Sequence, residues 1–292
     1  MGDHNSKFEE ELKLWTWLGH NLRGEACESL NNYEALKNHV KRALFADIEL
    51  LVEQTGQYQP PINPEIVAAQ RKIIAIEKAP LDTDALIVPC KGGFLMKINN
   101  TLPIVRQRFA CAHETAHTYF FDLANDPPSK PYKRSTTRYW VEEGLCYDLA
   151  RRILMPTDMI EKRAKDASPP YIGAFKDMMG TFLVSGELLA HRIRDLDTWD
   201  TLMLIFQNTE GAISLFKVLK SGDRLEDVHV ARKGLKVTDQ MLYQLLARAF
   251  QNELVEERDI ELSVGSFERK VTYFGASYIG SHPPKVIALL SL

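Results

Sequence analysis

Two histidines lie four residues apart in this sequence, with a glutamate directly after the first: His113, Glu114 and His117. On a helix, side chains four residues apart lie one above the other, so both imidazoles can bind one metal ion. Zinc in a catalytic site takes three protein ligands and lowers the pKa of water in its open position to about 7. Glu114 is placed to act as general base and then general acid. The alternative is a pair of core histidines on an apolar helix face.

A helix must position these side chains. Apolar residues recur at helical spacing from Val105 to Phe120, which predicts one amphipathic helix with His113 on its buried side. Pro103 suits the first turn, and Asn100 or Thr101 is the expected N-cap.

A third metal ligand is expected from the next helix, predicted over 139–154 and stopped by Pro156. Glu142 and Glu143 fall on opposite shoulders of its apolar face, because successive helical residues are about 100° apart. Periodicity does not choose between them. Both could instead be exposed acids favoured near the helix start by the helix dipole.

A hairpin is predicted just before the histidine helix. The β-prone runs 86–88 and 94–98 flank Pro89-Cys90-Lys91-Gly92-Gly93. A strand in this place can offer its edge to an extended substrate, or it can be an ordinary sheet strand covered by other elements.

Other residues near the expected site could assist. The proline-rich loop 124–134 and the residues after it hold four basic side chains that could meet an acidic substrate: Lys130, Lys133, Arg134 and Arg138. A solvated loop is the alternative. Tyr119 or Tyr139 could support catalysis, and the sequence selects neither.

The combined motifs resemble the ImmA/IrrE family of metallopeptidases. In that family an I-x-x-N strand end precedes q-R-F-x-x-A-H-E-x-x-H, and a helix of the form E-x-x-C-[DN]-x-[FA]-A-x-x-L-L-x-P follows. The matching segments here are 98–100, 106–117 and 143–156, and 182–185 resembles the family's F-x-V-S entry into a small helix. The resemblance spans roughly residues 34–196. Tyr147, Asp148 and Leu149 differ from the family form.

This resemblance implies a zinc-dependent endopeptidase with His113, His117 and Glu143 as metal ligands and Glu114 as the catalytic residue. Mn²⁺ is an alternative to Zn²⁺. The implied substrate is a specific regulatory protein, typically a helix-turn-helix repressor cleaved to release stress or mobile-element genes. A rival function is a metal-binding regulator that acts by protein binding without proteolysis.

Composition limits the other function classes. The 292 residues carry a net charge of −3, which argues against electrostatic capture of nucleic acid. No window reaches 18 uninterrupted apolar residues, and Asp3, Glu9 and Glu10 lie where a secretory leader would be basic and then apolar. We therefore expect a cytoplasmic protein with no membrane partner. Four scattered cysteines without C-x-x-C spacing suggest neither disulfides nor a thiolate zinc site.

The expected fold class is α+β. A mostly helical, zincin-like metallopeptidase domain with N-terminal helices and a small β-sheet is predicted over 1–156. A helical region packed on the peptidase follows over 157–198, and a C-terminal antiparallel α+β domain over 199–292. Some relatives carry a GAF-like sensor in this last position, which suggests ligand sensing, and a docking platform is the alternative. A DNA-binding reading of the 157–196 helices is disfavoured by Glu187, Asp195 and Asp197 beside Arg192 and Arg194.

Overall fold

The computed structural model describes residues 2–23, 32–131, 135–222, 225, 228–230, 233–280 and 283–292, with the side chains of residues 7–22 and of the later ranges. The chain divides into two compact units, Met1–Pro156 and Thr157–Leu292. In the part of the chain that is described, no helix is both long and apolar enough to cross a bilayer.

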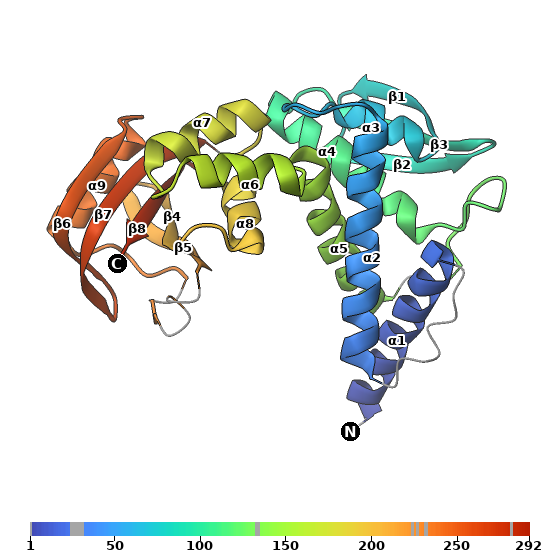
Figure 1. Cartoon of the computed structure of the whole chain (residues 1–292), viewed down its shortest axis with the longest axis horizontal. Helices are drawn as coiled ribbons and strands as arrows, with labels where there is room; N and C mark the ends of the chain where they lie inside the picture. Colours follow the sequence, from blue (N-terminus) through green and yellow to red (C-terminus); the bar gives the residue numbers. More distant parts are fainter. Residues whose placement is uncertain are drawn as a thin grey trace. The chain divides into compact units, whose positions relative to one another are not determined.

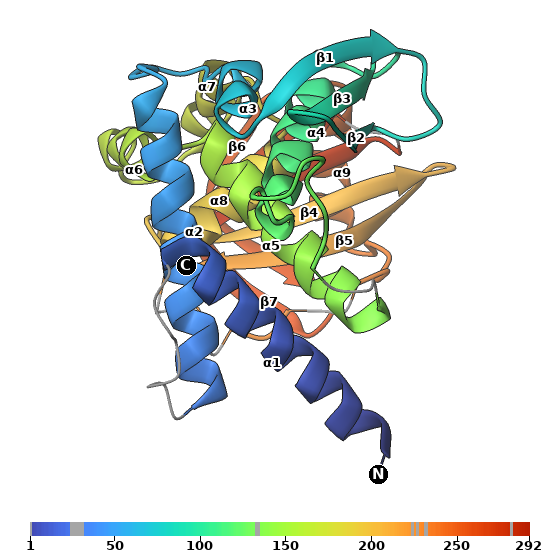
Figure 2. The ribbon, with the colours of Figure 1, turned by 90° about the vertical axis from the view of Figure 1, so that its right-hand side faces the viewer.

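The first unit is mostly helical and carries a three-stranded sheet (Figure 1). Figures 1 and 2 show the sheet at one end of this unit and α1 toward the other. Its elements are α1 (Gly2–Arg23), α2 (Tyr33–Gln54), α3 (Pro64–Gln70), β1 (Ile73–Ala79), β2 (Ala85–Cys90), β3 (Gly93–Asn99), α4 (Ile104–His117), a 3₁₀ turn (Thr118–Phe120) and α5 (Thr136–Leu154). The expected mixed α+β class is confirmed for this unit and for the second.

The small sheet has the order β1-β3-β2, with β1 parallel and β2 antiparallel to the central β3. Phe94, Met96 and Ile98 of β3 are buried against Cys111 of α4, so the central strand packs on the histidine helix. The expected hairpin is therefore an edge strand, β2, and a central strand, β3, joined at Lys91-Gly92.

The hairpin depends on Gly93. Its φ is +153°, and an added Cβ would lie 2.1 Å from the Lys72 carbonyl oxygen. We expect Gly93→Ala to lower the free energy of unfolding by about 2–5 kcal/mol, because backbone strain and overpacking add. Gly92 is the matched control, since its φ is +85° but its Cβ position is open. Gly92→Ala should cost about 1 kcal/mol. Urea denaturation checks both, and equal losses would contradict the role of the contact with Lys72.

Helix α4 begins without the predicted cap. Its N-cap is Pro103 and makes no side-chain capping hydrogen bond. The predicted cap at Asn100 or Thr101 is wrong because the hydroxyl of Thr101 donates to the Asn99 side chain at 2.7 Å, which closes the turn after β3. The residues of α4 that face its neighbours are small, including Ala112 and Ala116, so α4 lies close to both α5 and the sheet.

Helix α5 begins three residues earlier than the sequence predicts, at Thr136. Ser135 is the N-cap, and its hydroxyl accepts from the Arg138 backbone N–H at 3.3 Å. The same hydroxyl donates to Glu10 of α1 at 2.5 Å. The start of α5 is thus held by a cap and by a contact with the N-terminal helix.

The second unit is a five-stranded antiparallel sheet with helices. Its strand order is β5-β4-β8-β7-β6. Its elements are α6 (Thr157–Asp166), α7 (Ile172–Phe182), α8 (Gly186–Leu196), β4 (Thr201–Thr209), β5 (Ala212–Ser221), α9 (Gln240–Phe250), β6 (Val255–Val264), β7 (Phe267–Gly280) and β8 (Lys285–Ser291). Residues 228–231 are a β-prone run that would suit a strand, but 228–230 form none and Ala231 lies outside the described residues.

Helices cover both faces of this sheet. Phe274 and Ala276 of β7 are buried in one cluster with residues of α9. On the opposite face, an added Cβ on Gly275 would lie 2.8 Å from Ile172 of α7, and one on Gly186 of α8 would lie 2.5 Å from Ile279. The helices of 157–198 therefore form a layer of the sheet unit. The three-part division of the chain, with a boundary near 197–200, stays a prediction.

Candidate metal centre

Helices α4 and α5 bring three potential metal ligands together. His113 Nε2 lies 3.1 Å from His117 Nε2 and 3.2 Å from Glu143 Oε2, and His117 Nε2 lies 3.6 Å from Glu143 Oε1. Ligands about 2.0–2.1 Å from a tetrahedral zinc ion are separated from one another by about 3.3 Å. The three side chains therefore fit one tetrahedral ion. Within the described ranges they form the one cluster of His, Cys, Asp and Glu side chains with this property.

Glu142 takes a different position from Glu143. Its side chain is 4% exposed, and its Oε1 accepts from His117 Nδ1 at 2.7 Å and from Lys130 Nζ at 2.5 Å. A hydrogen bond at Nδ1 fixes the tautomer whose Nε2 lone pair faces Glu143. Glu142 thus orients His117, and Glu143 supplies the carboxylate oxygens near both Nε2 atoms.

The two glutamates are both ionised more readily than an ordinary carboxyl. The hydrogen bond with His113 lowers the pKa of Glu143, against the opposing effect of burial. Burial would raise the pKa of Glu142, but its hydrogen bonds with His117 and Lys130 outweigh that effect and lower it. Carboxylate oxygens and neutral imidazole nitrogens are suitable ligands for Zn²⁺, and carboxylates also suit Mn²⁺.

Glu114 lies beside the cluster and outside it. Burial raises the pKa of its carboxyl, whereas His117, His113 and a hydrogen bond from the Ile87 backbone N–H act in the opposite direction. Because Ile87 belongs to β2, Glu114 contacts the edge strand while His113 and His117 face α5.

The Nδ1 side of the His113 ring is held by contacts with aromatic rings and not by hydrogen bonds. Its Nδ1 is buried without a hydrogen-bond partner among the described residues. Its ring centroid lies 4.8 Å from that of Tyr147 and 5.9 Å from that of Phe109, and Phe109 and Tyr147 stack at 5.5 Å. Tyr147 is the site neighbour that sequence reasoning missed. Tyr147 lies one helical turn after Glu143. It also differs from the family form, and this difference is the sequence feature that points to it.

The tyrosines named from the sequence take other places. The hydroxyl of Tyr119 donates to Asp47 at 2.5 Å, its ring covers the guanidinium of Arg71 at 3.8 Å, and the side chain is buried. This tyrosine supports the fold. The ring of Tyr139 lies against that of Trp140, with centroids 5.1 Å apart.

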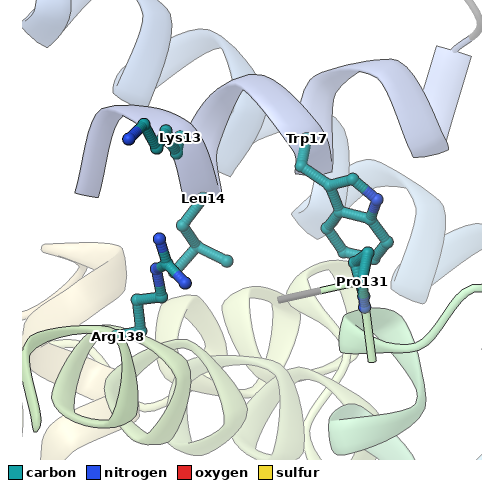
Figure 3. A pocket seen from close by; sticks show the side chains of 5 residues that line it. All are labelled: Lys13, Leu14, Trp17, Pro131 and Arg138. Carbon is teal, nitrogen blue, oxygen red and sulfur yellow. The ribbon is translucent and has the colours of Figure 1, made fainter. Parts of the chain in front are cut away.

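The basic residues of the loop region are divided between two places. Lys130 pairs with Glu142, as described above. Arg138 lines a cavity of about 340 Å³ together with Lys13, Leu14, Trp17 and Pro131 (Figure 3). None of the three clustered ligands lines that cavity. Lys133 and Arg134 lie outside the described residues.

Residues 73–194 match the IrrE N-terminal-like domain of the M78 peptidases, a range that contains all four candidate site residues. No curated protein matches the chain. A solved structure of a Mycobacterium tuberculosis transcriptional regulator is 13% identical, with a TM-score of 0.54 over 86% of this chain and 76% of that chain. At such identity the likeness shows the fold alone. Residues 73–194 therefore form an IrrE N-terminal-like domain, and this match supports membership of the ImmA/IrrE family.

Proposed function

We propose that this protein is a zinc-dependent endopeptidase that cleaves a specific protein, a helix-turn-helix transcriptional repressor, in a stress or mobile-element response. The observation that carries the proposal is the convergence of His113, His117 and Glu143, with Glu114 beside them, inside an IrrE N-terminal-like domain. A repressor substrate places the protein in the cytoplasm. The C-terminal sheet would then sense a ligand or dock the substrate, and nucleic acid is not a direct partner.

The residues present fit a bound divalent ion, Zn²⁺ or alternatively Mn²⁺. His113, His117 and Glu143 would hold it, and Glu142 would keep His117 in the required tautomer. When bound, such an ion polarises a carbonyl group and lowers the pKa of water.

Glu114 has the position of the proton carrier. It would accept a proton from the attacking water and donate it to the nitrogen of the leaving amine. The Ile87 backbone N–H, which donates to its carboxylate, orients the group. Neither His113 nor His117 is needed for this transfer, because both are engaged through Nε2 in the cluster.

The outer edge of β2 suits an extended substrate. In an antiparallel pair, alternate residues of an edge strand direct their N–H and C=O groups away from the neighbouring strand. The Ile87 N–H reaches Glu114, so Ala85, Ile87 and Pro89 form the outward set. Pro89 has no N–H, which limits the pairing of this edge with unrelated strands. A substrate segment paired here would pass beside Glu114.

The proposal is tested by incubating the purified, zinc-loaded protein with each helix-turn-helix protein whose reading frame neighbours its own. We expect two fragments by mass spectrometry, loss of cleavage with 1,10-phenanthroline, and recovery when zinc is added in excess. A repressor that binds tightly but stays intact would contradict proteolysis and favour a regulator that acts by binding.

A further inference from the structure

Helix α5 carries an exposed glycine next to the candidate ligand Glu143. Gly144 lies more than two turns from either end of the helix (Thr136–Leu154). Glycine in a helix interior is destabilising relative to alanine. An added Cβ on Gly144 would meet no heavy atom within 4 Å, so nothing in the described chain requires a glycine there.

Two exposed aromatic side chains lie on either side of this glycine along the helix. The spacing of Trp140, Gly144 and Tyr147 places them on one helical face, which Glu143 borders. Trp140 is 67% exposed and Tyr147 is 47% exposed. We refer to Trp140, Gly144 and Tyr147 as the α5 aromatic face. Large exposed aromatic side chains beside a bare backbone are typical of surfaces that bind a partner chain.

The position of this face follows from the contacts of α4. Helix α4 packs on β2 and β3 and also on α5. Glu114 of α4 accepts from Ile87 of β2, whereas His113 and His117 meet Glu143 of α5. Helix α4 thus connects the edge of β2, through Glu114, with Glu143 of α5, through the two histidines. The ring of Tyr147, 4.8 Å from that of His113, lies at the border between the cluster and the α5 aromatic face.

We infer that the α5 aromatic face selects the substrate by receiving a large apolar side chain of the polypeptide next to the cleaved bond. This inference rests on the proposed peptidase function. The two rings supply apolar contact area, and neither carries a charge that would favour a charged side chain. Because Gly144 has no side chain, the bound chain can approach the helix backbone closely. This use would explain why a glycine is present although it destabilises the helix relative to alanine.

The test compares two exposed helical glycines, Gly144 in the interior of α5 and Gly180 in the last turn of α7. Gly180 of α7 is also exposed and helical, and an added Cβ there would likewise meet nothing within 4 Å. Gly144→Ala and Gly180→Ala should each raise Tm by about 2–4 °C. Gly144→Ala should lower kcat/KM at least about tenfold, equivalent to 1.4 kcal/mol, while Gly180→Ala leaves it unchanged. A structural role for Gly144 would instead lower Tm.

The apolar preference is tested by digesting a proteome-derived peptide library with the zinc-loaded full chain and reading the cleavage sites by mass spectrometry. We expect Phe, Leu or Met to be enriched at one position beside the cleaved bond. The variant Trp140→Ala should weaken that enrichment and raise KM, and Trp140→Phe should preserve both. A wild-type protein that cuts neither these peptides nor any candidate repressor would overturn the proposed function together with this inference, and wild-type cleavage of peptides without this enrichment would overturn the inference alone. Cleavage with the same site preference and rate in Gly144→Ala and Trp140→Ala would overturn the inference alone.

Discussion

Replacing Glu114 by glutamine is expected to slow substrate cleavage by about 10²–10⁴-fold, the usual contribution of a positioned general acid–base. Glutamine has nearly the same shape as glutamate, and its amide cannot take the proton of the attacking water. Glu114 lies outside the cluster of His113, His117 and Glu143, so the variant should still bind one metal ion per chain. Cleavage rates and metal content, measured on the same preparation, check both expectations.

The matched control is Glu77→Gln. Glu77 is also in the first unit, on β1, and its exposed side chain pairs with Lys97 at 3.3 Å, away from the candidate ligands. This variant should cleave at the wild-type rate. If Glu114→Gln cleaves at the wild-type rate, Glu114 is not the general base of the reaction. If regulation by the protein survives in Glu114→Gln, it depends on binding and not on proteolysis.

The second large effect is a loss of metal binding, which we expect to differ between variants of the adjacent residues Glu142 and Glu143. Glu143→Ala removes a carboxylate whose oxygens lie 3.2 Å and 3.6 Å from the two histidine Nε2 atoms. The cluster then keeps only two ligands, and the purified variant should hold no stoichiometric zinc. Glu142→Gln keeps all three ligands and weakens the support of His117, which typically lowers metal affinity by about 10–100-fold.

Zinc content after dialysis and zinc titration by calorimetry would measure this difference. Circular dichroism shows whether each variant is folded, a needed check because the Glu142 side chain is 4% exposed and carries a hydrogen bond from Lys130. Greater loss of zinc in Glu142→Gln than in Glu143→Ala would mean that Glu142 is the third ligand. His113→Ala should behave like Glu143→Ala, since it also leaves two ligands.

Local patterns predicted much of this fold because they act over short stretches of chain. The hairpin before α4 follows from β-prone runs around a glycine pair, and β2 and β3 are found there. Helix α3 has Asn63 as its N-cap and Pro64 at its first position, which are local signals that typically begin a helix. The cap of α4 failed for the same local reason, since the Thr101 hydroxyl that would cap the helix is already used by Asn99.

Contacts between elements could not be predicted in this way. The apolar run of β4 indicates a strand but not what covers it, and the structure shows every residue from Thr201 to Phe206 buried. A strand buried on both faces requires a layer on each side. The helices of 157–198 supply one of these layers, and they therefore belong to the same compact unit as the sheet.

The sequence by itself determined the resemblance to the ImmA/IrrE family, the α+β class and the candidate metal ligands, because these depend on residue types and helical spacing. Helical spacing alone left Glu142 and Glu143 equivalent, since each lies about 100° from the next on a helix whose orientation was unknown, and only the family resemblance favoured Glu143. Only the packing of α4 against α5 turned Glu143 toward both Nε2 atoms and Glu142 toward Nδ1 of His117. The same packing brought Tyr147 against His113 and left Gly144 exposed beside the site, because the rotation of a helix about its axis is set by its neighbours.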